Sequence, residues 1–381
     1  MRARDLGINP GKLATGPKNS ILDIPGVSVG QTTIIKGDDV RTGVTVILPR
    51  PQDDIQKPCY AGFHVLNGAG ELTGCHEIKE WGWTNTPLAM TNSVGLGKVY
   101  DAIWHWMFDR ARAAGQSEDE IIANYGAPVI GETMDGFLNN WTLDTIQKEH
   151  VYEAFEKAKS GAEVQEGSYG GGTGMLCHQF KGGTGTASRM VPSDTSHDEH
   201  TVGVIVQTNY GLKQDLQIGG VPIGKLLLRE KEQEATQTQQ SNDGQGGSIL
   251  VYIITDAPVL PHQLNRMAQR ATGGISAVTR HGIGLNPSGD IFLALSTANV
   301  PTQNLEGKQR QWYGPVQTNQ VETVRDQSIN GLFYAVAEAT EEAILNSMVG
   351  ARDGMKGWRG SNIEAFPVEK VKALLEKHLV V

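Results

Sequence analysis

The residues with the clearest chemical potential stand where a polar segment meets an apolar one. Residues 234–247 (EATQTQQSNDGQGG) contain almost no apolar side chains and are expected to be exposed to solvent. Ser248 follows directly and begins the apolar run 248–255, which is typical of a strand buried on both faces. A serine in this place could attack the carbonyl carbon of Gly247 with its hydroxyl, and water could then hydrolyse the resulting ester.

Cleavage at this junction would leave Ser248 with a free α-amine beside its own hydroxyl. A serine hydroxyl needs a neighbouring base, and an α-amine with a pKa of roughly 7.7–8.0 suits that role at neutral pH. Gly247 would give the backbone the conformational freedom that the attack requires. The alternative is an ordinary loop-to-strand turn at Gly246-Gly247-Ser248, which the same residues also fit.

The predicted strands and helices that must position this junction partly alternate along the chain and partly follow one another in groups of the same kind. Strands or short apolar runs are predicted at 27–33, 43–48, 62–66, 88–93, 127–130, 174–180, 184–190, 201–207, 248–255 and 291–297. Helices are predicted at 96–113, 151–159, 223–234, 261–280, 330–349 and 367–380, with an irregular arm at 1–20 and a polar loop at 192–200. This order indicates an α/β or α+β fold in which sheets are buried between helices.

Length and composition exclude several classes of protein. The 381 residues suffice for two domains or for one large layered domain. A net charge of −9 without a basic run argues against nucleic acid as a partner. No run approaches the roughly 18 apolar residues of a membrane span, and no apolar signal segment follows the basic start. With three scattered cysteines and no CxxC pair, a cytoplasmic protein without a disulfide scaffold is expected.

Three other patterns could indicate different chemistry. The glycine-rich segments 170–174 and 182–185 fit neither GxGxxG nor GxxxxGK[ST], so nucleotide binding is not expected. The cluster His197–His200 lies in a polar loop without HExxH spacing, so we expect a solvated loop and no metal. A Ser-His-Asp triad would need His262 or His281, but no GxSxG motif supports it.

Short motifs follow one another in a fixed order along nearly the whole chain. They occupy residues 23–30, 41–45, 67–71, 91–95, 131–133, 135–136, 170–174, 207–211, 247–249, 288–290 and 337–344. In this order they resemble the family of L-aminopeptidase/D-amidase-esterases and β-aminopeptidases, which are self-processing serine peptidases. A more distant resemblance extends to nylon-oligomer hydrolases and ornithine acetyltransferases, which use threonine as the nucleophile.

The resemblance implies an α+β fold: a four-layer αββα sandwich, N-terminal-nucleophile-like with altered connectivity. It implies a single catalytic domain over 1–381 that is processed into fragments 1–247 and 248–381, which remain associated. It also implies a homo-oligomer, a tetramer of such fragment pairs, and no cofactor.

Individual roles carry over by position. Ser248 matches the nucleophile whose own amine is the base, and Asn209 matches the asparagine that stabilises the oxyanion. Ser288 and Asp290 match a serine and an acidic residue that orient the amine and hydroxyl, although relatives often have glutamate in place of Asp290. Glu132 matches the acidic residue that receives the ammonium group of the substrate.

Met134 departs from the pattern, because some relatives carry a tyrosine there whose hydroxyl assists at the oxyanion. A methionine cannot donate that hydrogen bond, so catalysis would depend on Asn209 and a backbone N–H, and we expect a preference shifted towards β-amino-acid amides. The expected reaction is removal of N-terminal α- or β-amino acids from small peptides, amides and esters through an acyl-enzyme on Ser248. The alternatives are an acyltransferase and a non-catalytic relative that binds small metabolites.

Overall fold

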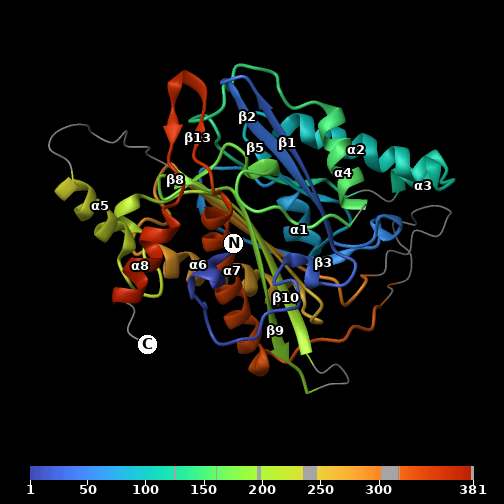
Figure 1. The fold of residues 1–381 in the computed structure, drawn as a ribbon. Helices are drawn as coiled ribbons and strands as arrows, with labels where there is room; N and C mark the ends of the chain where they lie inside the picture. The colour runs from blue at the N-terminus through green and yellow to red at the C-terminus, as the bar shows by residue number, and fades with distance from the viewer. Residues whose placement is uncertain are drawn as a thin grey trace.

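The computed structural model describes residues 1–123, 126–159, 161–194, 199–234, 247–301, 316 and 318–378 (Figure 1). Most of the predicted polar segment 234–247 lies outside these residues. Glu234 ends helix α5 (Ile223–Glu234), and Gly247 precedes the next strand. In the described part of the chain, no helix is long and apolar enough to cross a membrane.

The larger sheet contains the junction strand. Its strands, in spatial order, are β4 (Trp83–Thr84), β3 (Cys59–Gly68), β12 (Gly289–Ser296), β11 (Ser248–Thr255), β10 (Glu199–Asn209) and β9 (Thr184–Pro192). Neighbouring strands run antiparallel except β11 and β12, which are parallel. Helix α6 (Pro261–Val278) connects these two, because parallel neighbours need a crossover.

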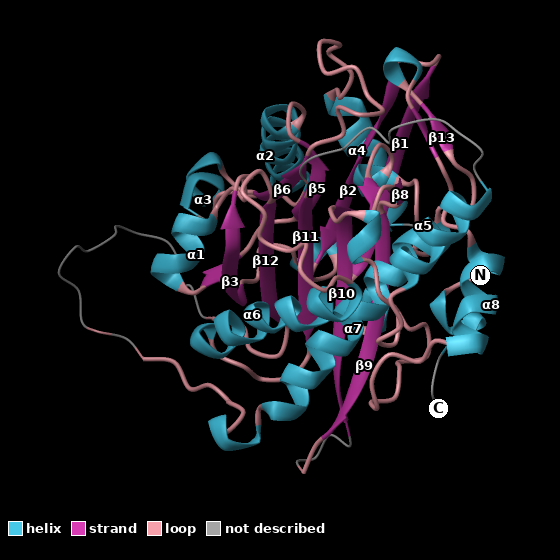
Figure 2. Cartoon of the chain, turned by 90° about the vertical axis from the view of Figure 1, so that its left-hand side faces the viewer, coloured by secondary structure: helices cyan, strands magenta, loops and turns pink. Residues whose placement is uncertain are grey.

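The smaller sheet stacks on the larger one. Its strands, in order, are β1 (Ser28–Lys36), β2 (Val40–Leu48), β5 (Leu88–Asn92) and β6 (Val129–Thr133). Helices α2 (Leu96–Ala113) and α4 (Lys148–Lys159) pack on its outer face. Helix α6 and helix α7 (Asn330–Gly350) cover the outer face of the larger sheet, as Figure 2 shows. The result is a four-layer αββα sandwich of the α+β class, as the resemblance predicts.

Strand β11 is the clearest example of how sequence builds these layers. Its side chains alternate between two cores because successive strand residues point to opposite faces. Ile249, Val251 and Ile253 pack towards α6 and α7. The intervening apolar residues pack between the sheets, where Tyr252 donates a hydrogen bond of 3.0 Å to the carbonyl of Ala89. All eight residues of β11 are buried, which confirms the prediction of a strand covered on both faces.

The prediction of a single strand over 174–180 is wrong. The chain instead forms the hairpin of β7 (Leu176–Cys177) and β8 (Phe180–Lys181). His178 and Gln179 make its turn with φ values of 50° and 63°, a conformation that favours glycine and that sequence reasoning does not expect of these residues.

Two further differences concern polar segments. The loop predicted at 192–200 is shorter at both ends, since β9 extends to Pro192 and β10 begins at Glu199. The predicted arm at 1–20 includes a short 3-10 helix at Ala3–Leu6 and is tied to the body by ion pairs. The remaining elements are α1 (Cys75–Trp81), α3 (Glu118–Ala123), β13 (Met355–Lys356), β14 (Asn362–Ile363) and α8 (Val368–His378).

Candidate active site

Ser248 lies at the end of the central strands, where several chain segments meet. It is the first residue of β11, is 7% exposed and stands directly opposite Asn209, the last residue of β10. Its hydroxyl oxygen accepts a hydrogen bond of 3.1 Å from the backbone N–H of Gly289, which begins β12. The hydroxyl therefore sits between two strands, beside a backbone donor.

Gly247 is held against the end of β10. A β-carbon on this residue would come within 2.3 Å of Tyr210 Cα and 2.4 Å of the Asn209 carbonyl oxygen. Glycine is thus required by close approach of the backbone, a reason that differs from the conformational one suggested by the sequence. The Gly247–Ser248 peptide lies immediately beside Asn209.

The side chain of Asn209 is oriented by two hydrogen bonds. Its amide oxygen accepts from the N–H of Leu176 at 3.1 Å, and its amide nitrogen donates to the carbonyl of Met134 at 2.7 Å. These partners distinguish the oxygen from the nitrogen. A primary amide has two N–H donors, so one donor remains in addition to the bond with Met134. That donor is suited to an oxyanion formed next to Ser248.

Ser288 and Asp290 form a hydrogen-bonded pair at the start of β12. The Ser288 hydroxyl donates to Asp290 Oδ1 at 2.6 Å, and the N–H of Gly284 donates to Asp290 Oδ2 at 2.9 Å. Asp290 also stands opposite Ile249, the neighbour of Ser248. Burial raises the pKa of the Asp290 carboxyl, although hydrogen bonds from Ser288 and from backbone N–H groups oppose that rise. The pair therefore lies on the strand next to Ser248, beside its chain neighbour Ile249.

Glu132 reaches the same region from the smaller sheet. It lies near the end of β6, where its carboxylate accepts hydrogen bonds from the Ser93 hydroxyl and, at 3.0 Å, from the N–H of Glu71. A β-carbon on Gly70 would lie 3.2 Å from both Glu132 Oε1 and Gly289 Cα. Glu132 is thus separated from the strand that contacts Ser248 by about the width of one glycine.

Met134 contributes through its backbone, since its carbonyl holds the Asn209 amide. The next residue, Asp135, is fully buried and accepts hydrogen bonds from Asn92, Asn139 and Trp141. Burial raises the pKa of Asp135, while its hydrogen bonds lower it. This network fixes the segment that carries the Met134 carbonyl.

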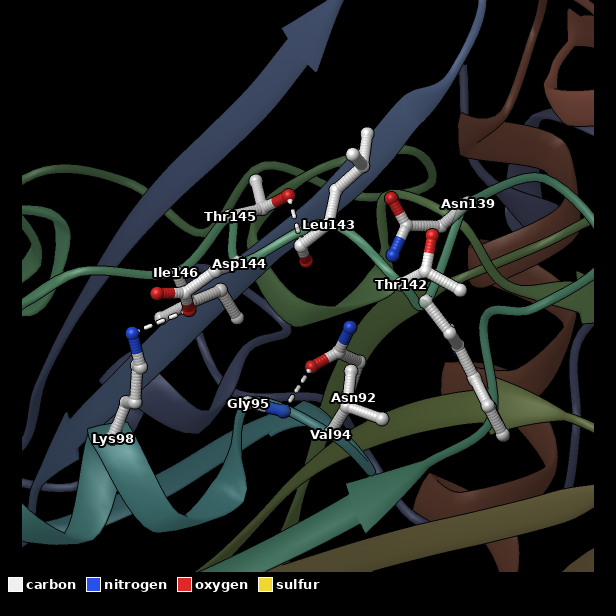
Figure 3. Close-up of a pocket in the computed structure, with 11 residues that line it drawn as sticks. Asn92, Val94, Gly95, Lys98, Asn139, Thr142, Leu143, Asp144, Thr145 and Ile146 are labelled. Atoms are coloured by element: carbon white, nitrogen blue, oxygen red, sulfur yellow. Dashed lines mark hydrogen bonds and ion pairs between the residues drawn. The ribbon is translucent and has the colours of Figure 1, made fainter.

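A cavity of about 120 Å³ opens beside Asn92 and Val94 (Figure 3). It lies between the start of α2 and the loop 139–146. Its lining residues are Asn92, Val94, Gly95, Lys98, Asn139, Trp141, Thr142, Leu143, Asp144, Thr145 and Ile146. Asn92 and Val94 flank Ser93, the hydroxyl donor to Glu132, so two lining residues are direct chain neighbours of that donor.

The competing patterns do not converge on Ser248. His262 begins α6, beyond the opposite end of β11, and is paired with Asp326 at 3.8 Å. His281 is exposed, and within the described residues no hydrogen bond joins it to Ser248. Of the cluster His197–His200, the first two residues lie outside the described residues, and Glu199 and His200 begin β10.

The glycine-rich segment 170–174 packs between elements of the fold. A β-carbon on Gly171 would lie 2.1 Å from Gln207 Oε1, so the segment fills space between the sheets. Within the described residues, no group of three or more histidine, cysteine or acidic side chains is arranged to hold a metal.

Sequence reasoning missed several residues at this site. Gly289, Ser93 and Glu71 lie inside motifs that carry the family resemblance. The motifs indicated these segments, but they did not indicate the hydrogen bonds that the three residues make with Ser248 and Glu132. Leu176 lies in the segment wrongly predicted as one strand. Its N–H contact with Asn209 exists only because the chain reverses at His178.

The chain is similar to known proteins over most of its length. Residues 19–363 match the model of peptidase family S58. The beta-peptidyl aminopeptidase BapA of Sphingosinicella microcystinivorans is 40% identical over 99% of this chain and 92% of its own length. A solved beta-aminopeptidase of a Burkholderia species has a TM-score of 0.85 at 40% identity, with both chains fully covered.

A second solved structure links the fold to a wider group. It is the L-aminopeptidase D-Ala-esterase/amidase of Ochrobactrum anthropi, described as a prototype for the serine aminopeptidases and as a new variant of the Ntn hydrolase fold. It has a TM-score of 0.86 at 38% identity and covers 99% of this chain and 98% of its own.

Proposed function

Since the chain belongs to peptidase family S58, we propose that Ser248 is the residue that carries out its peptidase chemistry. The chain is a serine-type aminopeptidase and amidase that acts at the N-terminal residue of its substrates. The single observation that supports the role of Ser248 is its place in the β10–β11 register. There its hydroxyl accepts from the Gly289 N–H, and Asn209 stands directly opposite in the neighbouring strand.

The first step is cleavage of the chain itself. The Ser248 hydroxyl oxygen attacks the carbonyl carbon of Gly247, and the C–N bond breaks as the hydroxyl proton passes to the departing nitrogen. Water then hydrolyses the ester, which leaves a carboxylate on Gly247 and both a hydroxyl and an α-amine on Ser248. The remaining N–H of Asn209 stabilises the negative charge on the carbonyl oxygen in the transition state.

Turnover repeats this chemistry on a substrate. The free α-amine of Ser248 takes the hydroxyl proton, and the oxygen attacks the substrate carbonyl to form an acyl-enzyme and release an amine or alcohol. Water, activated by the same amine, hydrolyses the acyl-enzyme. Ser288 and Asp290 orient the amine, and Glu132 binds the ammonium group of the substrate, which restricts the enzyme to free N-terminal residues.

The two fragments should remain associated after cleavage. β11 and β12 belong to fragment 248–381 but lie between β3 and β10 of fragment 1–247, and cleavage leaves both ladders intact. We further propose a homo-oligomer, a tetramer of fragment pairs, with light scattering of the active enzyme as the test. A cytoplasmic location is consistent with three free cysteines and is tested by cell fractionation.

Denaturing electrophoresis and intact mass test the proposal directly. Active protein should appear as fragments 1–247 and 248–381, whereas Ser248→Ala should remain one inactive chain. Ser248→Cys is the matched control, because a thiol can undergo the same shift and should still split. A single full-length band from fully active protein would contradict self-processing.

The relatives indicate the substrates to compare. Because relatives of this chain are β-aminopeptidases and an L-aminopeptidase D-Ala-esterase/amidase, we propose that it accepts amides of small β-amino acids. The side chain of Met134, in place of a tyrosine hydroxyl, supports this preference. The order of substrate preference is measured as the turnover of β-homoalanine, L-alanine and D-alanine p-nitroanilides by the processed enzyme. Aminolysis products formed with an added amine would instead identify an acyltransferase.

A further inference from the structure

Lys181 is a lysine with no exposed surface, one peptide group away from the site. Its ammonium group donates to the carbonyls of Met175 and Gly182, each at 2.7 Å, and to that of Gly172 at 3.4 Å. Its three N–H donors are therefore directed at three backbone oxygens. Within the described residues, no carboxylate forms an ion pair with it.

Such a cation is costly to bury. Removing an ammonium group from water is strongly unfavourable, and here only neutral carbonyls compensate for the lost hydration. Burial lowers the pKa of Lys181 to about 7, and the nearby Cys177 opposes this change, so the full positive charge is present below that pH. Burial also raises the pKa of Cys177 to about 12, so its thiol is neutral near pH 7.

A single peptide group connects this ammonium to Asn209. The carbonyl of Met175 accepts from Lys181 Nζ at 2.7 Å, and the N–H of the same peptide, on Leu176, donates to Asn209 Oδ1 at 3.1 Å. Hydrogen bonds in such a chain polarise one another. A positive charge at the carbonyl end makes the N–H a stronger donor, which in turn makes the Asn209 amide nitrogen a stronger donor.

The hairpin geometry aligns this chain of bonds. Lys181 stands directly opposite Leu176 in the β7–β8 pair. The tip of the hairpin is anchored to the segment that follows Asn209: the N–H of His178 donates to the Tyr210 carbonyl at 2.8 Å, and His178 Nδ1 lies 2.9 Å from the Leu212 carbonyl. The side chain of Asn209 and the backbone that follows it are thus held by the same hairpin.

We propose that Lys181 is a positioning residue that strengthens and orients the Asn209 oxyanion donor through the Met175–Leu176 peptide. The inference rests on the proposed oxyanion role of Asn209. A need to satisfy the Met175 carbonyl does not explain the lysine, since the N–H of Gly182 already donates to that oxygen at 3.2 Å. A neutral apolar side chain would avoid the desolvation cost, but it would leave the buried Gly182 carbonyl without the donor that Lys181 supplies.

The test is a double-mutant cycle of Lys181→Met and Asn209→Ala in the full chain. Loss of an oxyanion donor costs roughly 10²–10³-fold in kcat, so we expect Asn209→Ala to show that loss and Lys181→Met to show a smaller one, about tenfold. KM should stay within about twofold, because the effect belongs to the transition state. In the Asn209→Ala background, Lys181→Met should change kcat less than about twofold. The rate of chain splitting is a parallel readout.

Lys213→Met is the matched control. Lys213 is also largely buried and packs over the ring of Phe180 in the same hairpin, but its ammonium group pairs with Glu364 at 3.6 Å. The Lys213→Met variant should have a kcat within about twofold of that of the unaltered enzyme. If Lys181→Met does not fold, Lys181→Gln replaces it, because glutamine keeps an amide donor but not the charge. This variant should also lower kcat while KM stays unchanged.

The outcomes separate this inference from the proposed function. Full activity of Asn209→Ala would remove the oxyanion role itself and the inference with it. An inactive Asn209→Ala with fully active Lys181 variants would overturn only the inference. Equal losses from Lys181→Met in both backgrounds, or an equal loss from Lys213→Met, would also overturn it.

Discussion

Two clusters of charged residues inside this sandwich differ in how the negative charge of their carboxylates is balanced. The arm cluster consists of the carboxylates Glu338 and Glu342 with the cations Arg4 and Arg189. The site cluster consists of the carboxylates Glu132 and Asp290. In the arm cluster, Arg189 pairs with Glu342 at 2.8 Å and with Glu338 at 3.2 Å, and Arg4 pairs with Glu342 at 2.8 Å. In the site cluster, the donors are hydroxyls and backbone N–H groups, and the described residues supply no ion pair.

The pKa shifts follow this difference. Burial alone would raise the pKa of Glu342, but a hydrogen bond from Arg4 and the charge of Arg189 hold it below its usual value. Burial raises the pKa of Asp290, which has no such cation. The arm cluster thus contains its own counter-charges and holds the chain start on α7. In the proposed mechanism, the cations of the site cluster are supplied by the chemistry: the Ser248 amine and the ammonium group of a substrate.

The largest expected effect is on the stability of the arm cluster. Arg189→Met leaves Glu338 and Glu342 buried beside fewer cations, so the free energy of unfolding should fall by about 3–5 kcal/mol. Urea unfolding measures this loss, and kcat per processed molecule should not change. Arg4→Met is the control and should cost less, because the Arg4 side chain is one-third exposed at 33%. If Arg189→Met lost turnover while its free energy of unfolding stayed the same, the arm cluster would not differ from the site cluster in its role.

Glu132→Gln tests the site cluster. It keeps the shape but removes the charge, so kcat/KM for substrates with a free amino group should fall by the roughly 1.5–3 kcal/mol of a charged hydrogen bond, about 10- to 150-fold. Chain splitting should be normal, because the intact chain presents no ammonium group there. Glu71→Gln is the control, since Glu71 is exposed and contacts Glu132 only through its backbone. An equal loss in both variants would argue against an ammonium site.

Asp290→Asn should slow both chain splitting and turnover by roughly tenfold, since it removes the charge that, through Ser288, orients the Ser248 hydroxyl before splitting and the Ser248 amine afterwards. The pH profile provides the second measurement. Because the pKa of Asp290 is raised, its charge is lost as pH falls through a value above the usual aspartate range. Glu342→Gln is the control in the arm cluster, and its turnover should be unchanged. A normal splitting rate in Asp290→Asn would contradict the orienting role.

The smallest effect concerns Glu341, next to the arm cluster. Burial raises its pKa to about 7, although the charge of Arg189 opposes this. Between its ordinary pKa and pH 7 the unfolded chain is ionised while the folded chain keeps the proton, so stability falls as pH rises through that window. Glu341→Gln should therefore raise the free energy of unfolding by about 1 kcal/mol at pH 8 and leave it unchanged at pH 4. A gain at pH 4 would contradict this account.

Local patterns in the sequence account for much of the fold. Helix α2 has the predicted bounds 96–113 because its apolar residues follow the helical period. Strand β11 has the predicted bounds 248–255 because an eight-residue apolar run fits a strand covered on both faces. The hairpin at 176–181 was not predictable, since His178 and Gln179 adopt positive φ only where contacts with residues 210–213 stabilise that turn.

By itself, the sequence determined where the nucleophile candidate lies, because the change from polar to apolar residues at Ser248 is a local property of the chain. Its ordered motifs also predicted, through the family resemblance, that Asn209, Ser288, Asp290 and Glu132 belong to one site. Only the tertiary structure decided how they meet. The register of β10 and β11 places Asn209 opposite Ser248, and a hairpin reversal brings a buried ammonium within one peptide of that amide. Register and reversal depend on contacts between segments far apart in the chain, which no local pattern encodes.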